Sequence, residues 1–430
     1  MRRDNIKFND IAWNTLGTVT YAIVSLLLSV IVIKLCGIEE GGIFSFGFST
    51  LAHLVFIISF FGIRPMHIVD IKYRFSFKDY LRFGLKSLSL AILAGVIYVA
   101  YRHFIGTYNT TKSYLLIILV LHGAIDGFAD YFESEYQRVN KLYMGGQSEF
   151  FRIIFFAASL IITLHITNDL LFSELVAIGT EIVMFYFLNI SRSRTVFKNA
   201  KLNDGGVKSS LLFIEALPLF LITFLDFYIF ASAKISIDAN LLVDPDKYSG
   251  FFNLVFMPTN IIYLSMTLVM KPMLTPLSNA YHADKMEYKK ILNNTFLFAL
   301  AVAVLSMVGA VFLGKIYFDL VNIILGGQYE WSRNIIVYNG LSLDYVVLLI
   351  VMFGGIFYTI CTPMYFSIII ENKQKYLLIS YAIVAIISMF ISKFYVKSEG
   401  VIGAAISFVI SMFLLFVGIL VIRVLTRNEK

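Results

Sequence analysis

The sequence predicts an all-α, polytopic membrane protein with twelve transmembrane helices in two six-helix lobes around a central cavity. Hydrophobic residues make up 59% of the 430 residues, charged residues only 15%, and the mean hydropathy is +0.80. A soluble chain of this length does not carry such a composition. Twelve apolar runs are each long enough to cross a bilayer, which takes about 20 residues. A polar stretch separates the sixth run from the seventh.

The polar stretch is strongly basic and predicts the boundary between the lobes. It opens with Arg192 and Arg194, continues with three lysines, and has Asp204 as its single acid. We therefore expect three parts: an N-terminal lobe at 1–190, a cytoplasmic linker at 191–208 and a C-terminal lobe at 209–430.

The expected spans follow directly from the apolar runs. They are 10–34, 42–63, 80–101, 113–133, 149–166, 170–190, 209–232, 249–270, 291–315, 340–369, 375–393 and 401–423. Residues 316–339 fit either an extension of the ninth helix or an external loop. Alternating the spans from a cytoplasmic N-terminus places about three quarters of the 35 lysines and arginines inside, which predicts that both termini are cytoplasmic.

The two halves share a local pattern. Gly42 precedes Arg64-Pro65-Met66 by 22 residues, and Gly250 precedes Lys271-Pro272-Met273 by 21 residues. Both patterns fall on the second helix of their half, as a parallel repeat requires. Arg64 and Lys271 would then form a cationic mouth suited to a diphosphate. The alternative for these two residues, and for Arg152, is that they snorkel to lipid phosphates.

Ionisable residues inside apolar runs are the other candidates, because they are costly in hydrocarbon. His122, Asp126 and Asp130 are spaced by four residues, which places them on one helical face where they could conduct protons or bind a cation. Alternatively, Asp130, Glu133 and Glu135 are only the polar cytoplasmic end of that helix, which leaves Asp126 as the one deep acid. In the seventh span, Asp226 lies near the middle and Glu215 lies closer to the end. We expect five residues to couple transport to an ion: His122, Asp126, Asp130, Glu215 and Asp226.

Signatures of catalysis are missing from the sequence. It has no phosphate-binding glycine loop before a helix and no metal-ligand cluster, and its two cysteines lie in different halves. We therefore expect no enzymatic activity, no cofactor and no resident metal.

Motifs in both halves resemble one known family. In the first half they are WNTLG from Trp13, GIFSFGFS from Gly42, FGIRPMHIVDIK from Phe61 and DGFADYFESEYQRVNKLYMGGQSEFFR from Asp126. In the second half they are LPLFL from Leu217, SIDANLL from Ser236, FFNLVFMP from Phe251, KPMLTPL from Lys271, LDYVVLLIVMFGG from Leu343 and GVIGAA from Gly400. Together they resemble the bacterial polysaccharide repeat-unit flippases of the multidrug/oligosaccharidyl-lipid/polysaccharide exporter superfamily.

The resemblance implies two lobes that open alternately to each side of the membrane and a cargo of undecaprenyl-diphosphate-linked oligosaccharide. Related cell-wall precursor flippases carry cavity arginines on helices 1, 2 and 8. Arg64 and Lys271 match the last two by position, whereas helix 1 of this chain offers Asn14. Sodium sites of some relatives use acids on helices 7 and 11. Asp226 fits the former, but helix 11 offers only hydroxyl groups, among them Tyr381.

The expected function is therefore flipping of a lipid-linked glycan from the cytoplasmic to the outer leaflet of the bacterial cell membrane, driven by H+ or Na+ or by the membrane potential. Its partners would be membrane lipids and glycan-assembly enzymes, with no nucleic acid. Three alternatives remain open: a cation or drug exporter of the same fold, a membrane glycosyltransferase or polymerase, and a scaffold for glycan assembly. The sequence does not distinguish capsule, O-antigen or teichoic acid as the product.

Overall fold

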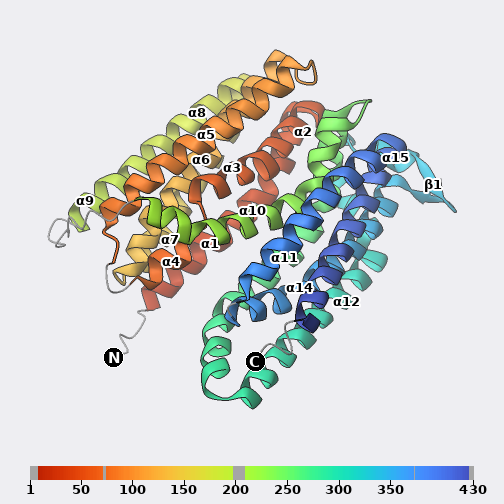
Figure 1. Cartoon of the computed structure of the whole chain (residues 1–430). Coiled ribbons are helices and arrows are strands. Elements are labelled where there is room, and N and C mark those ends of the chain that lie inside the picture. Colours follow the sequence, from red (N-terminus) through yellow and green to blue (C-terminus); the bar gives the residue numbers. More distant parts are fainter. Residues whose placement is uncertain (1–7, 71–73, 197–208, 372, 426–430) are drawn as a thin grey trace. The chain divides into compact units, whose positions relative to one another are not determined.

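The computed structural model describes residues 8–70, 74–196, 209–371 and 373–425, and this part of the chain is helical apart from connecting turns and one two-stranded hairpin. Ten of its helices are long and apolar enough to cross a membrane. The predicted all-α, polytopic membrane fold is thereby confirmed (Figure 1).

The helices gather into two compact units, residues 1–224 and 225–430. The boundary between the units falls within α10 (Ser209–Asn240), after Phe224. Of the predicted basic linker, residues 197–208 lie outside the described residues, so its role as the lobe boundary stays a prediction.

Unit 1 holds the helices expected for the first six spans and the first part of α10. Their bounds are α1 (Phe8–Cys36), α2 (Ile38–Phe46), η1 (Gly47–Leu51), α3 (Ala52–Phe60), α4 (Arg64–Val69), α5 (Phe77–Phe104), α6 (Thr110–Arg138), α7 (Leu142–Thr167), α8 (Leu170–Phe185), η2 (Tyr186–Ser191) and α9 (Arg192–Val196). The second span consists of α2, the π-helical turn η1 and α3 in direct succession. The sixth is built the same way from α8, η2 and α9.

Unit 2 holds the rest of α10 and the helices expected for the last five spans. Their bounds are α11 (Pro245–Ala283), α12 (Lys285–Ile324), α13 (Glu330–Asn334), β1 (Ile336–Tyr338), β2 (Leu341–Ser342), α14 (Leu343–Ile370) and α15 (Gln374–Leu425). Two expected spans share α15, which is interrupted at Gly400 with φ 60° and ψ −131°, a conformation that only glycine adopts readily. Residues 316–339 were expected to form either an extension of the ninth helix or an external loop. They continue α12 to Ile324 and then form α13 and the hairpin strand β1.

Polar side chains in the connections set where several helices of unit 1 begin. Ser76 and Asp79 form a reciprocal capping box at the start of α5. Asn109 accepts a hydrogen bond from the Lys112 backbone at the start of α6, and Asp169 caps α8 in the same way. Each cap satisfies a backbone N–H that would otherwise lack a partner, so these turns fix the register of the apolar helices that follow.

Helix α6 lies at the centre of unit 1. In its apolar window 83% of the residues are buried, compared with 33% for α5 and for α7, and it packs against α3, α5, α7 and α8 (Figure 1). Gly123 allows α3 to approach closely, because a Cβ atom there would lie 2.1 Å from the Ala52 carbonyl oxygen. Polar residues on α6 are therefore held inside the bundle.

Candidate ion and substrate site in unit 1

The polar face predicted for α6 is buried in unit 1. His122, Asp126 and Asp130 are all shielded from solvent, and so is Glu133 one turn further on. Asp130 and Glu133 are thus as buried as Asp126, and the ion-coupling role of these acids stays a prediction. Four ionisable groups inside one helix bundle need partners, and these come from neighbouring helices.

Arg152 of α7 is the partner shared by most of these acids. Its guanidinium lies 2.7 Å from Asp126 and 3.1 Å from Glu133, and its third carboxylate is Glu181 of α8 at 3.9 Å. The Arg152 side chain is only 4% exposed. Snorkelling of Arg152 to lipid is therefore contradicted, because the charge is satisfied inside the bundle. Its assignment as a substrate contact stays a prediction.

His122 joins the same group of charges through Glu181. Its Nδ1 atom lies 2.8 Å from the Glu181 carboxylate. The imidazole is stacked against Phe48 and Phe156, with centroid distances of 5.2 and 4.4 Å. These rings fix the orientation of the imidazole, so that one nitrogen faces the carboxylate.

Arg64, the first residue of α4, extends the group at the other end. Its guanidinium contacts Asp130 and reaches the Gln137 amide oxygen at 3.5 Å. Asp130 also accepts a hydrogen bond from Ser134 at 3.1 Å. Unlike Arg152, Arg64 keeps 34% of its side chain exposed. It is therefore the charged residue of this group with access to the surroundings.

We call these residues the central ionic cluster. Its members are Arg64, His122, Asp126, Asp130, Glu133, Arg152 and Glu181. Four carboxylates thus face two guanidinium groups. A buried excess of negative charge is costly in a membrane, so such a cluster favours the uptake of protons or of a cation. Among the described residues no group of histidines, cysteines and acids has the arrangement of a metal site.

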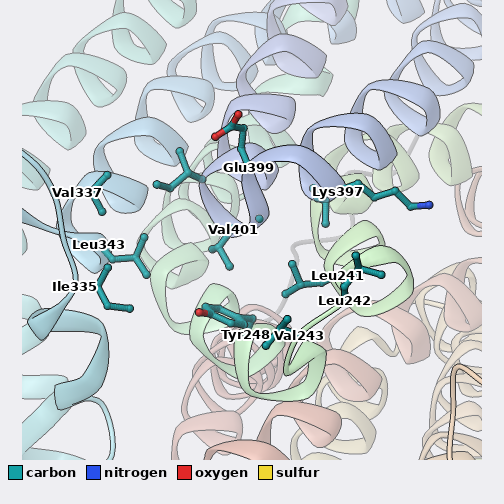
Figure 2. Close-up of a pocket in the computed structure, with 13 residues that line it drawn as sticks. Leu241, Leu242, Val243, Tyr248, Ile335, Val337, Leu343, Lys397, Glu399 and Val401 are labelled. Atoms are coloured by element: carbon teal, nitrogen blue, oxygen red, sulfur yellow. The ribbon is translucent and has the colours of Figure 1, made fainter.

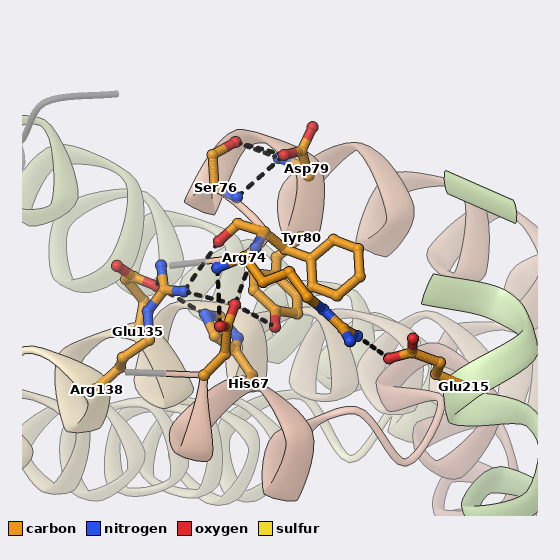
Figure 3. Close-up of polar contacts among 10 residues, drawn as sticks. His67, Arg74, Ser76, Asp79, Tyr80, Glu135, Arg138 and Glu215 are labelled. Carbon is orange, nitrogen blue, oxygen red and sulfur yellow. Dashed lines mark hydrogen bonds and ion pairs between the residues drawn. The ribbon is translucent and has the colours of Figure 1, made fainter. Parts of the chain in front are cut away.

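A second set of contacts, the loop cluster, joins His67 of α4, Asp70, and Tyr80 of α5 to Glu135 and Arg138 of α6 (Figure 3). Glu135 lies 2.6 Å from both His67 and Arg138, and Arg138 lies 3.6 Å from Asp70. Tyr80 donates to Asp70 at 3.3 Å. Burial lowers the pKa of His67, and the hydrogen bond to Glu135 acts in the opposite direction. The neutral imidazole therefore donates a hydrogen bond from Nε2–H to the Glu135 carboxylate, and the cluster fixes the helix that presents Arg64.

Glu215 is not part of either cluster. It pairs with Arg74 near the start of α10, where the two side chains are 29% and 55% exposed (Figure 3). Pairs with this much exposure contribute little to stability. The structure thus separates Glu215 from the other residues expected to couple ions, and its coupling role remains a prediction.

Asp226 lies in unit 2 and has partners of its own there. Its carboxylate accepts a hydrogen bond from Tyr358 at 3.1 Å, and Tyr381 lies beside it. One turn further along α10, Phe230 packs against Tyr263 and Tyr358 with centroid distances of 5.5 and 5.3 Å. The expected partner from the eleventh span is therefore a tyrosine hydroxyl rather than a second acid.

Two expected substrate contacts remain without a described role. Lys271 lies in α11, but its side chain is outside the described residues. Asn14 of α1 is half-buried, and its backbone packs against Gly146 of α7. The cationic mouth formed by Arg64 and Lys271 stays a prediction.

Glu174 and Lys234 are among the buried ionisable residues that were not predicted as site residues. Glu174 lies inside α8, and Lys234 of α10 lies 4.5 Å above the ring of Phe256. Lys234 was missed because the seventh span was expected to end at residue 232, whereas α10 continues to Asn240. Glu174 was missed although it stands in an apolar run, the same signal that identified Asp226.

A cavity of about 420 Å³ lies at one end of unit 2 (Figure 2). It is enclosed mainly by apolar side chains, including Leu241, Val243 and Val401, while Lys397 and Glu399 stand at its edge with their charged ends pointing outward. None of the predicted site residues lines it. The predicted site residues of the described chain therefore lie outside this cavity.

No protein-family model and no curated protein sequence matches the chain. Solved structures do match its fold. The chain is similar to the lipid II flippase MurJ in an inward closed conformation, with 16% identity, a TM-score of 0.64 and coverage of 97% of this chain and 88% of that one. An inward-facing multidrug resistance MATE family transporter of the MOP superfamily has 12% identity, a TM-score of 0.59 and coverage of 97% and 96%.

The Vibrio cholerae MATE transporter VcmN gives a similar result, with 13% identity, a TM-score of 0.60 and coverage of 98% and 97% of the two chains. At these identities the likeness establishes the fold, which is that of MATE and MurJ transporters. It is a fold that different kinds of cargo can share.

Proposed function

We propose that the protein flips an undecaprenyl-diphosphate-linked oligosaccharide from the cytoplasmic to the outer leaflet of a bacterial cell membrane by alternating access. Support comes from its fold, which it shares with a lipid II flippase, and from the motifs that resemble polysaccharide repeat-unit flippases. The proposed process moves the cargo without changing it chemically, so no catalytic group or cofactor is involved.

The observation that carries this proposal is the state of Arg64. Its side chain is 34% exposed, whereas that of its counterion Asp130 is only 7% exposed. A planar guanidinium binds carboxylate and phosphate oxygens in the same geometry. A diphosphate can therefore replace or join Asp130 on the exposed side of Arg64. Lys271, at the related position of the second half, would supply a further positive charge.

The central ionic cluster contains more carboxylates than guanidinium groups, and we propose that this excess of negative charge couples flipping to H+ or Na+. When a diphosphate binds Arg64, Asp130 loses part of its counterion and gains affinity for a proton or a cation. By reciprocity, binding of that ion to Asp130 frees Arg64 for the diphosphate. Asp226 with its tyrosine partners is a second proposed ion site, in unit 2.

Export of organic cations is the second candidate function, and the surroundings of Asp226 favour it. An acid beside Phe230, Tyr263 and Tyr358 combines a negative charge with aromatic faces, which is the chemistry that binds organic cations. The two functions predict opposite charges at the cargo site. Transport by a cation exporter requires Asp226 and does not require Arg64.

The test uses the purified full chain in liposomes with a fluorescent undecaprenyl-diphosphate oligosaccharide, whose head group is followed with an impermeant quencher. We expect flipping by the wild type, a loss of at least tenfold in Arg64→Ala, and partial recovery in Arg64→Lys. Arg194→Ala, which removes an exposed cation outside the cluster, is the control. Transport of an organic cation dye that requires Asp226 but not Arg64, without flipping of the lipid, would establish the second function instead.

A further inference from the structure

Glu174 of α8 is a buried carboxyl group that does not belong to the central ionic cluster. Its side chain is 0% exposed, and neither of its carboxylate oxygens has a hydrogen-bond partner among the described residues. The adjacent Ser173 hydroxyl is already used, because it donates to the Asp169 carbonyl at 2.6 Å. A carboxylate buried without a partner is strongly disfavoured, so the group binds a proton and becomes neutral.

Glu174 shares a buried stripe of α8 with the central ionic cluster. The buried residues of this helix recur every three or four positions and include Glu174, Ala177, Ile178 and Glu181. Two helical turns, about 10 Å, separate the two acids. The residues between the two acids on this stripe, Ala177 and Ile178, are apolar, so proton transfer from Glu174 to the Glu181–His122 pair requires water.

Cys36, the last residue of α1, and Glu40 of α2 lie near Glu174. Glu40 and Glu174 both lie close enough to the Cys36 thiol to act on it electrostatically. Glu40 is exposed, whereas Glu174 is buried. The titratable groups around Glu174 are thus Cys36 on α1, Glu40 on α2, and Asp169 and Glu181 on its own helix.

We infer that Glu174 binds a proton and passes it to the central ionic cluster, and that it lies towards the end of unit 1 opposite Arg64. The start of α8 and the start of α6 lie at the same end of the bundle, because α7 runs back between them, while Asp130 and Arg64 lie towards the end of α6. A proton passes from Glu174 to the Glu181–His122 pair, and Glu174 is then protonated again from the Glu40 side. The inference rests on the proposed ion coupling and identifies H+ as the ion.

Infrared difference spectroscopy of the purified full chain tests the site without any transport. In the wild type at pH 7 the carbonyl band of protonated carboxyl groups should include a contribution from Glu174, and Glu174→Gln should lose this contribution. Glu39→Gln, which changes an exposed acid on neighbouring α2, should retain it. Because glutamine resembles the neutral acid in shape, Glu174→Gln should keep the thermal stability of the wild type. A carbonyl band in folded Glu174→Gln that is identical to that of the wild type would overturn the inference.

A second measurement separates this inference from the proposed function. Proteoliposomes are given an outside-acid pH gradient, and flipping of the fluorescent lipid is compared with and without it. We expect acceleration in the wild type and in Glu39→Gln, and its loss in Glu174→Gln with flipping down the cargo gradient retained. Gradient-driven flipping that persists in Glu174→Gln contradicts the inference alone. Absence of flipping in the wild type contradicts the proposed function, whereas the infrared result still decides whether Glu174 binds a proton.

Discussion

Arg152 and Asp126 lie 2.7 Å apart on adjacent helices, with side chains 4% and 11% exposed. The same guanidinium reaches Glu133 on α6 and Glu181 on α8, so a single side chain joins three helices of unit 1. A buried pair of this kind contributes modestly as an intact unit, but removal of one partner leaves charges without compensation. Arg152 is therefore required for the fold of unit 1 as well as for its charge state.

Arg152→Ala should destabilise the protein by about 3–5 kcal/mol, because three buried carboxylates lose their shared counterion. Arg152→Lys should lose less, since it keeps the charge but not the forked geometry. Thermal unfolding in detergent measures both effects. Arg194→Ala, which removes an exposed arginine of α9, should leave the melting temperature unchanged. Equal melting temperatures for Arg152→Ala and the wild type would contradict the proposed counterion role.

Gly146→Val should weaken the contact between α1 and α7, because a Cβ atom at Gly146 would lie 2.3 Å from the Trp13 carbonyl oxygen. Forcing the two backbones apart should cost at least about 1–3 kcal/mol. Gly179→Ala is the matched control, since nothing lies within 4 Å of its added Cβ atom. We expect a lower melting temperature in the first variant and no decrease in the second. A similar response of both would mean that close packing at Gly146 is not important.

The helices were largely predictable from the sequence because bilayer thickness imposes a length on every apolar run. The expected span 113–133 corresponds to α6, which extends to Arg138. Hydropathy does not report which side chains meet, so the sequence could place His122, Asp126 and Asp130 on one face but could not identify Arg152 as a partner. Arg152 looked like a helix-end residue, and only the packing of α7 on α6 shows that it is buried.

Asp226→Asn should reduce ion-driven transport without unfolding unit 2. Asparagine can still accept the hydrogen bond from Tyr358, so the packing around Phe230 should persist. The charge that binds an ion is lost. Flipping is measured in proteoliposomes with an H+ or a Na+ gradient. The gradient that accelerates flipping by the wild type should no longer accelerate it in Asp226→Asn. Tyr358→Phe, which keeps the acid and removes the donor, should retain most of this acceleration. If Asp226→Asn responds to both gradients as the wild type does, Asp226 is not a coupling residue.

His67 should make the stability of the protein fall in acid. Burial lowers the pKa of His67 in the folded state, and the ordinary pKa of an exposed histidine is about 6.5. Between these two values the unfolded chain binds more protons than the folded chain, so the free energy of unfolding rises with pH in this window. Stability is therefore lost as the pH falls below about 6.5. Melting temperatures measured from pH 5 to 8 should show this loss in the wild type and a smaller one in His67→Gln. His165→Gln, which changes an exposed histidine at the end of α7, should follow the wild type. An unchanged slope in folded His67→Gln would show that the acid sensitivity arises elsewhere, because glutamine can still donate a hydrogen bond to Glu135 but cannot gain a proton in this range.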